Sequence, residues 1–521
     1  MENLGLNWLD VVVFVAFFGV VVSVSMYKSR VEKTTEDFFL AGRALTWPFI
    51  GLSLIAANIS TEHFVGMAGQ AAGAAGLAIA SYEWLAAVTL VFVALFFLPR
   101  LLSAGIFTIP EFLEYRYNPL ARAIMAFYTM AIYVGVTISA VLYSGGLTLQ
   151  TIFGDLANPD HLLTSVWVIG GIAALYTIWG GLKAVAWADL FQGSALIIGG
   201  TITMVLGFQA VGGVGTFFSQ NADKLHMVLP ADHSVLPWTA LVVGLHIPNF
   251  YYWGLNQYIT QRTLAARTLR QGQLGIIFAA FLKLIIPFVI VLPGLMALQL
   301  YGDQLAGASG TDAAYPLLVR NLLSPGLRAF ILATISGAVI SSLASMLNSA
   351  STIFTMDLFK RHWKTDASQR TLVRTGRLTT AIFVVIGCFI APYLGDPRFL
   401  GIFTYIQEFQ GYISPGVLAV FIFGLFFHRA PASAGVVGLL LTVPVYGFLQ
   451  LQFGEVAFLN RMAITFAVIV LVIAVLTWLK PLPQPRVLPR RQEFDMRSTP
   501  LVKWLGISVI LTTVIFYIIF W

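Results

Sequence analysis

The sequence predicts an all-α polytopic membrane protein with fourteen transmembrane helices. Three observations lead to this fold class. Of the 521 residues, 58% are hydrophobic and 10% are charged, and the mean hydropathy of +0.84 lies far above that of soluble domains. Apolar runs of about 20 residues, the length that crosses a bilayer as a helix, recur along the whole chain. The basic residues are distributed as alternating loops on the two sides of a membrane require.

The apolar runs begin close to the N-terminus. No Lys or Arg precedes Lys28, so the first run lacks the basic segment of a cleaved signal peptide, and we expect it to remain in the mature protein. Fourteen runs are found, at residues 8–27, 46–72, 78–99, 122–153, 162–181, 187–211, 237–260, 272–300, 327–356, 373–396, 399–427, 433–452, 458–478 and 500–520. This count makes residues 212–236 and 301–326 the two long loops on one side.

The positions of Lys and Arg test this number of spans. Odd-numbered connections, with the residues at their edges, hold 24 of the 30 Lys and Arg residues, whereas the other side holds five and Lys283 lies inside a span. A wrong number of spans would mix the two sets. Because cytoplasmic loops collect basic residues, both termini are predicted to be extracytoplasmic.

The second span carries polar residues where hydrocarbon is expected. Residues 53–69 read SLIAANISTEHFVGMAG and include Asn58, Glu62 and His63. Lipid cannot hydrogen-bond these groups, so they must face protein or water. The seventh span, five spans later, contains Pro248, which frees an upstream carbonyl. Two broken helices at this spacing predict a five-plus-five inverted repeat with a binding site at the midplane, although Pro and Gly are common in membrane helices without that role.

Five polar residues from five different spans are each surrounded by apolar sequence. They are His63, Glu83, Asn249, Lys283 and Gln407. Ionisable groups inside a span cost about 2.5–3.5 kcal/mol each, so their presence needs a reason. Together they offer donors and acceptors, as a neutral polyhydroxylated ligand such as a sugar requires. Aromatic residues that would cover the apolar faces of a sugar ring are Tyr82, Trp84, Tyr251, Tyr252 and Trp253. The alternative is that Glu83 and Lys283 form only a structural pair between helices.

Hydroxyl groups recur at helical spacing in the ninth span. With carbonyls freed near Ala56 and Ile59, the neighbouring Ser341 and Ser342 would suit a monovalent cation, since Ca²⁺ usually recruits several carboxylates. The alternative is that small residues only allow close helix packing. The sequence contains no phosphate-binding loop, paired metal-ligand spacing or nucleophile elbow, and its single cysteine, Cys388, cannot form a disulfide within the chain. We therefore expect no enzymatic activity.

Long motifs then extend over nearly the whole chain: EDFFLAGR (36–43), SLIAANIS (53–60), ASYEW (80–84), YTIWGGLKAVAWAD (176–189), NFYYWGLNQYITQRTLAA (249–266), FLKLIIPF (281–288), SSLASMLNSASTIFTMD (341–357) and YIQE (405–408). They resemble the sodium/solute symporter family, and most of all its sodium/glucose and sodium/galactose cotransporter branch. The resemblance implies fourteen helices with the LeuT-type five-plus-five inverted repeat. The expected division is an N-terminal helix and loop (1–45), the first repeat (46–211), the inverted second repeat (237–427) and three accessory helices (428–521).

The resemblance also implies roles for individual residues. Sodium would be bound by the carbonyls of Ala56, Ile59 and Ala338 and the hydroxyls of Ser341 and Ser342, and Asp189 matches an acidic residue near the ion path. The sugar would be bound by Glu83, Asn249, Lys283 and Gln407, with His63 facing it. The inner gate would be Tyr252, and the outer gate would be Met67, Tyr82 and Phe403.

The predicted function is sodium-driven uptake of a neutral hexose, galactose or glucose, across a bacterial inner membrane. Two positions depart from the pattern of close bacterial relatives, His63 in place of Gln and Ala86 in place of Ser, so the preferred hexose is left open. The alternatives are another polyol such as myo-inositol, or a membrane sugar sensor. Sodium, the hexose and the lipid bilayer are the expected partners, with no nucleic acid and no obligatory protein partner. Glu62 has no assigned role.

Overall fold

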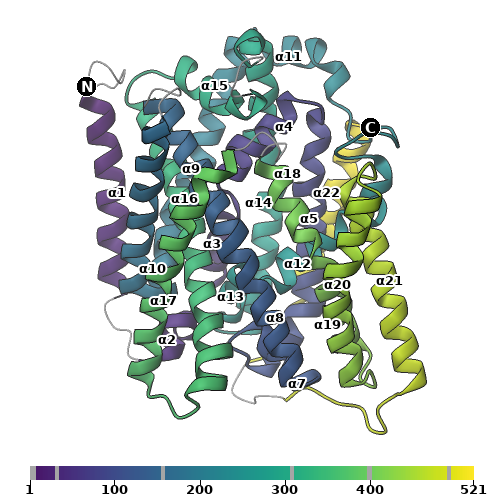
Figure 1. Ribbon diagram of the computed structural model, residues 1–521. Coiled ribbons are helices and arrows are strands. Elements are labelled where there is room, and N and C mark those ends of the chain that lie inside the picture. The colour runs from purple at the N-terminus through teal and green to yellow at the C-terminus, as the bar shows by residue number, and fades with distance from the viewer. Residues whose placement is uncertain (1–7, 30–33, 154–158, 306–309, 396–401, 490–494) are drawn as a thin grey trace.

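In the computed structural model the chain folds as a bundle of helices that run in one general direction (Figure 1). The structure describes residues 8–29, 34–153, 159–305, 310–395, 402–489 and 495–521, and within them one isolated bridge, between Leu45 and Ala266, is the only β-pairing. The α-helices are α1 Trp8–Lys28, α2 Thr35–Leu40, α3 Trp47–Asn58, α4 Ala68–Ala72, α5 Ser81–Phe92, α6 Leu98–Ala104, α7 Ile109–Arg116, α8 Pro119–Ile132, α9 Ile138–Phe153, α10 Pro159–Ala210, α11 Val214–Gln220, α12 His246–Leu255, α13 Gln257–Leu264, α14 Leu269–Leu305, α15 Ala314–Leu322, α16 Leu327–Ile353, α17 Gln369–Ile390, α18 Ile402–Gly411, α19 Ser414–Phe426, α20 Ala432–Gln452, α21 Phe458–Leu479 and α22 Pro500–Ile519. Short 3₁₀ or π-helical segments are η2 Ala41–Arg43, η3 Glu62–Met67, η4 Gly76–Ala80, η5 Val93–Phe97, η6 Tyr133–Thr137, η7 Ala222–Lys224, η8 Ala240–Gly244, η9 Gly310–Ala313, η10 Phe354–Trp363 and η11 Ala391–Gly395.

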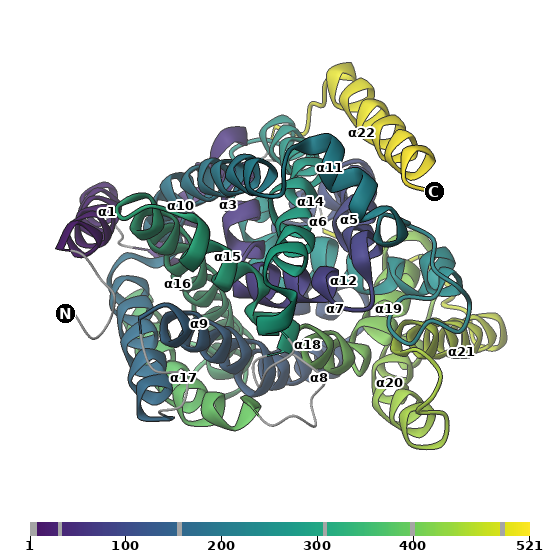
Figure 2. The ribbon, with the colours of Figure 1, turned by 90° about the horizontal axis from the view of Figure 1, so that it is seen from above.

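Burial separates central helices from peripheral ones. In the most apolar window of residues 327–363, which includes α16, 94% of the residues are buried, whereas the corresponding share in α1 is 17%. Seen from above, α1 and α22 lie at separate edges of the bundle (Figure 2). Helices from the two halves of the chain pack on one another, α3 against α14 and α10 against α16. Any site between these helices is therefore built by both halves.

The number of spans differs from the predicted fourteen when helices are judged by length and hydropathy. Among the described residues, ten helices are long and apolar enough to cross a membrane, or eleven if the bent pair Tyr405–Gly411 and Ser414–Phe426 is one span. The fourteen-span prediction is not established by this measure. Interruptions of the spans explain much of the difference, because α3, with 12 residues, and α12, with 10, are each too short to cross a membrane alone. In addition, α10 joins the predicted fifth and sixth spans across a kink at Gly181, where φ is 51°.

Two helices are interrupted at related places. α3 ends at Asn58, and Ile59 is extended (φ −79°, ψ 108°) before the π-helical segment η3. α12 ends at Leu255, and Asn256 is extended (φ −78°, ψ 123°) before α13. The extended residue of this second break, Asn256, lies eight residues after Pro248. Before Pro248 the chain is already helical, because η8 is π-helical up to Gly244 and Leu245 is in the right-handed helical region, so the proline follows a distorted turn four residues upstream.

Candidate functional site

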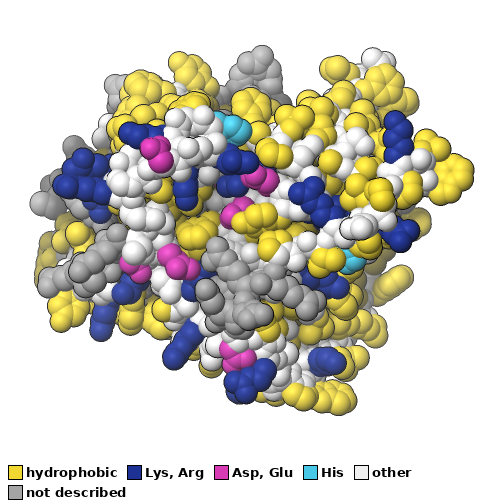
Figure 3. Space-filling view, turned by 90° about the horizontal axis from the view of Figure 1, so that it is seen from below, with side chains coloured by type: hydrophobic (Ala, Val, Ile, Leu, Met, Phe, Trp, Pro, Cys, Tyr) yellow, Lys and Arg dark blue, Asp and Glu magenta, His cyan; other side chains and the backbone are white. Residues whose placement is uncertain are grey.

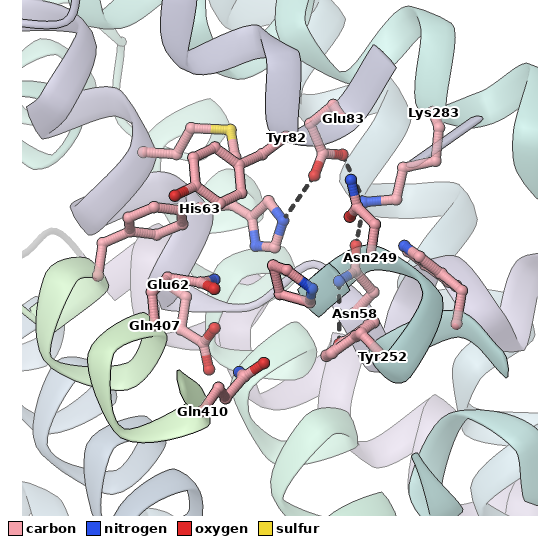
Figure 4. A pocket seen from close by; sticks show the side chains of 14 residues that line it. Asn58, Glu62, His63, Tyr82, Glu83, Asn249, Tyr252, Lys283, Gln407 and Gln410 are labelled. Carbon is pink, nitrogen blue, oxygen red and sulfur yellow. Dashed lines mark hydrogen bonds and ion pairs between the residues drawn. The ribbon is translucent and has the colours of Figure 1, made fainter. Parts of the chain in front are cut away.

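A cavity lies where these interrupted segments meet α5, α14 and α18 (Figure 4). A 47° bend between α18 and α19, with Pro415 in the first turn of α19, keeps α18 separate from the rest of its span. The lining residues come from α3, η3, α5, α12, α14 and α18. They are Asn58, Glu62, His63, Met67, Tyr82, Glu83, Pro248, Asn249, Tyr252, Trp253, Lys283, Phe403, Gln407 and Gln410.

One side of the cavity is held by a buried ion pair. The Lys283 ammonium donates hydrogen bonds to Glu83 and to Asn58 Oδ1, and it lies 4.9 Å from the centroid of the Trp253 ring. Both charged side chains are at most 4% exposed. Nε2 of His63 lies 3.3 Å from the second carboxylate oxygen of Glu83. Since two charges are costly to bury unless they are paired and hydrogen-bonded, this pair fixes α5 against α14 and also presents polar atoms to the cavity.

The other side of the cavity carries polar groups without protein partners. Figure 4 shows Glu62, Gln407 and Gln410 together, away from Glu83 and Lys283. Within the described residues, these three side chains make no hydrogen bond to the protein. The same holds for three buried atoms at the cavity, Asn249 Nδ2, Tyr82 Oη and His63 Nδ1. Buried polar atoms normally have partners, so this arrangement indicates a ligand that supplies them.

Two groups of aromatic residues bound the cavity. The rings of Tyr82 and Phe403 meet edge to face with centroids 5.0 Å apart, and Met67 is 1% exposed. A Cβ on Gly66 would lie 2.8 Å from Cβ of Phe403, so glycine permits this close approach of η3 to α18. On the other boundary, the Tyr252 hydroxyl accepts hydrogen bonds from Asn58 Nδ2 (2.9 Å) and the Tyr258 hydroxyl (2.6 Å). The predicted gate residues therefore all lie at the cavity.

A second polar cluster lies between α3, α10, α13 and α16. Asp189 accepts hydrogen bonds from Ser53 and Ser341, and one of its oxygens lies 3.0 Å from Nη2 of Arg262. Arg262 also donates to Ser345. Close by, Ser342 Oγ donates to the carbonyl oxygens of Ala57 (2.9 Å) and Ala56 (3.4 Å) at the end of α3.

This cluster contains residues predicted for sodium. The Ser342 hydroxyl of α16 meets the last carbonyls of α3, whereas the neighbouring Ser341 hydroxyl donates to Asp189, and Ala338 lies about one turn before both serines on α16. Ala56, Ile59, Ala338, Ser341 and Ser342 are all buried. Their role in binding sodium stays a prediction.

Sequence reasoning placed some residues at the cavity and missed others. His63, Glu83, Asn249, Lys283 and Gln407 line it together. The aromatic prediction was wrong for two residues, because neither Trp84 nor Tyr251 lines the cavity. The Trp84 indole donates to Leu284 O and packs against three aromatic residues of α22 or its end, Phe516, Tyr517 and Phe520. Gln410 was missed, although its spacing of three from Gln407 places both on one helix face.

The geometry defines a multi-pass membrane transporter with a central cavity. The Sodium:solute symporter family model matches residues 38–442, and the chain belongs to this family. It is thus a sodium-coupled symporter rather than an enzyme, and sodium is the co-transported ion.

Curated relatives agree with this assignment, and a solved structure shares the fold. The chain is 40% identical to a sodium/glucose cotransporter of Vibrio parahaemolyticus, with 91% of each chain covered. It is 34% identical to the sodium/myo-inositol cotransporter 2 of Oryctolagus cuniculus, over 85% of this chain and 69% of the relative. A solved Na⁺-coupled sialic acid symporter in a substrate-bound outward-open state has a TM-score of 0.80 at 22% identity, covering 91% of this chain and 98% of the other. This likeness shows the same fold, the LeuT-type arrangement predicted from the sequence.

Proposed function

We propose that this symporter couples inward flow of sodium to uptake of a neutral hexose, galactose or glucose. The observation that carries the proposal is the set of polar side chains at the cavity that have no protein partner. Sugar hydroxyls both donate and accept, which suits a mixture of Asn249, Gln407 and Glu62. The rings of Tyr252 and Trp253 suit the apolar faces of a sugar. The bacterial relative named a sodium/glucose cotransporter supports the same class of substrate.

Myo-inositol is the second candidate substrate. It is also a neutral ring that bears hydroxyls, and curated relatives at 34% identity are named sodium/myo-inositol cotransporters. We expect His63 to distinguish a hexose from myo-inositol, because its Nδ1 has no hydrogen-bond partner in the described protein and lies at the cavity.

Sodium would act through the contact between α3 and α16. The Ser342 hydroxyl bonds to the end of α3 where the helix is interrupted. An ion bound by Ala56, Ile59, Ala338, Ser341 and Ser342 would hold the two helices together and fix η3, which carries His63, toward the sugar. The ion supplies enough energy, since one charge gains ~2.3 kcal/mol at 100 mV and a tenfold gradient adds ~1.4 kcal/mol. One sodium per sugar would sustain roughly 500-fold accumulation.

The proposed membrane is the bacterial inner membrane, with both termini outside. The face seen from below, opposite both termini, carries many Lys and Arg side chains (Figure 3). The exposed basic residues Arg361, Lys364, Arg370 and Arg374 follow α16 or begin α17. A basic face of this kind supports a cytoplasmic location.

A competition panel tests the substrate. Purified protein in proteoliposomes with an inward sodium gradient would be given labelled galactose, with unlabelled galactose, glucose or myo-inositol as competitors. We expect both hexoses to inhibit at lower concentrations than myo-inositol. Stronger inhibition by myo-inositol would replace the hexose with that polyol, and no inhibition by any of the three would contradict a sugar cavity.

A further inference from the structure

Among the described residues that line the cavity, Glu62 is the one acidic side chain without an ion-pair partner. Glu83 and Lys283 neutralise each other, and the described lining contains no other Lys or Arg. Glu62 opens the π-helical segment η3, and π-helical turns inside membrane helices often mark functional sites. Its backbone amide bonds to Ser60 Oγ at 3.2 Å, while its carboxylate makes no hydrogen bond within the described part of the chain.

The side chains beside Glu62 carry no positive charge that would offset its carboxylate. Figure 4 places it beside Gln407 and Gln410, on the side of the cavity opposite the ion pair. The amide groups of these two residues can donate a hydrogen bond to a ligand but carry no charge to offset a carboxylate. With Glu62 ionised and His63 neutral, the described lining as a whole therefore has a net charge of about minus one.

We propose that Glu62 selects substrates by charge: it accepts hydrogen bonds from the hydroxyls of neutral sugars and excludes sugars that bear a carboxylate. This inference rests on the proposed function and deepens it by naming the charge class of the substrate. Adjacent hydroxyls can donate to the two oxygens of one carboxylate, whereas a second carboxylate brings repulsion and no donor. Gln410 assists as a neutral donor on the same side of the cavity.

The test compares two ligands of nearly equal shape. Galacturonate carries a carboxylate where galacturonamide carries a neutral amide. Their inhibition of labelled galactose uptake would be measured at zero membrane potential and pH 8, above the ordinary imidazole pKa of about 6.5, so that His63 is neutral. We expect wild-type protein to bind galacturonamide at least about 100-fold better. In Glu62→Gln this ratio should fall by at least about tenfold, equivalent to about 1.4 kcal/mol, and Glu62→Asp should restore much of it.

Two further measurements separate this proposal from folding defects and from the proposed function. Glu455→Gln removes the same charge from an exposed position between α20 and α21 and should leave the ratio unchanged. Thermal stabilisation of purified protein by each ligand gives a readout that needs no uptake. The inference would be overturned if Glu62→Gln left the ratio of galacturonamide to galacturonate binding unchanged, or if Glu455→Gln lowered that ratio as much as Glu62→Gln does. It would also be overturned if both ligands shifted the melting temperature of the wild-type protein equally, or if neither shifted it. Failure of galactose and glucose uptake, with the thermal shifts still selective, would instead contradict the proposed function.

Discussion

Two of the buried clusters of charge, that of Asp189 with Arg262 and that of Glu83 with Lys283, differ in how completely their polar atoms are paired. In the cluster of Asp189 and Arg262, both aspartate oxygens accept hydrogen bonds, and the hydroxyls of Ser53, Ser341 and Ser345 all have partners. In the cluster of Glu83 and Lys283, polar atoms of the surrounding cavity remain without partners. The first cluster is closed by the protein itself, while the second needs a ligand to complete it. We therefore expect changes in the first to act on stability and ion coupling, and changes in the second to act on sugar binding.

The largest expected effect comes from Glu83→Ala. The change removes a polar group from the cavity and leaves the Lys283 ammonium buried without its carboxylate, a situation that costs about 3–5 kcal/mol. Sugar binding, measured by calorimetry on purified protein, should become undetectable, and the melting temperature should fall.

Asp189→Ala is the matched control for that prediction. It breaks a comparable buried pair and should also lower the melting temperature, but sugar affinity at saturating sodium should stay within about threefold, because Asp189 does not line the cavity. Detectable sugar binding in Glu83→Ala, or its loss in Asp189→Ala, would remove the distinction between the clusters.

Gln407→Ala should weaken sugar binding by about 10- to 100-fold, the loss of one or two hydrogen bonds in a buried site. Its melting temperature without sugar should hardly change, because the Gln407 side chain makes no hydrogen bond to the described protein. Unchanged affinity would show that α18 does not contribute to the sugar site.

Ser342→Ala should raise the sodium concentration for half-maximal uptake by about fivefold, equivalent to the loss of about 1 kcal/mol from one hydroxyl ligand. The dependence on sugar at saturating sodium should change less. Uptake with the sodium dependence of wild-type protein would exclude this hydroxyl from the ion site.

The smallest expected effect is that of His63→Gln. The glutamine amide of the variant can hydrogen-bond from η3 into the cavity as the His63 imidazole does. Uptake should therefore persist, while the ratio of galactose to glucose uptake shifts by roughly two- to fivefold. A ratio identical to that of the wild type would show that His63 has no part in specificity.

Some of the fold and of the cavity was predictable because polarity inside a membrane span is informative. The run from Asn58 to His63 predicts an interrupted helix, and α3 does end at Asn58. Pro248 predicts a disturbed helix, and the turn that ends four residues upstream of it is π-helical, but the extended residue Asn256 follows eight residues later at a place that no proline marks.

Side-chain direction was the harder quantity to predict. Tyr251, Tyr252 and Trp253 are consecutive, and successive residues on a helix point about 100° apart, so they cannot all face one cavity. The adjacent residues Glu62 and His63 nevertheless both line it, and sequence patterns do not reveal the π-helical winding of η3 that carries them. The fourteen-span count also depends on how broken helices are treated, which composition alone does not decide.

The central claim is that sodium drives sugar into this cavity across the membrane. It is tested most directly by uptake of labelled galactose and glucose into proteoliposomes with sodium, potassium or proton gradients imposed one at a time. Accumulation above the external concentration with the sodium gradient alone is the predicted result. Equal uptake with all three gradients, or accumulation driven by protons without sodium, would contradict it.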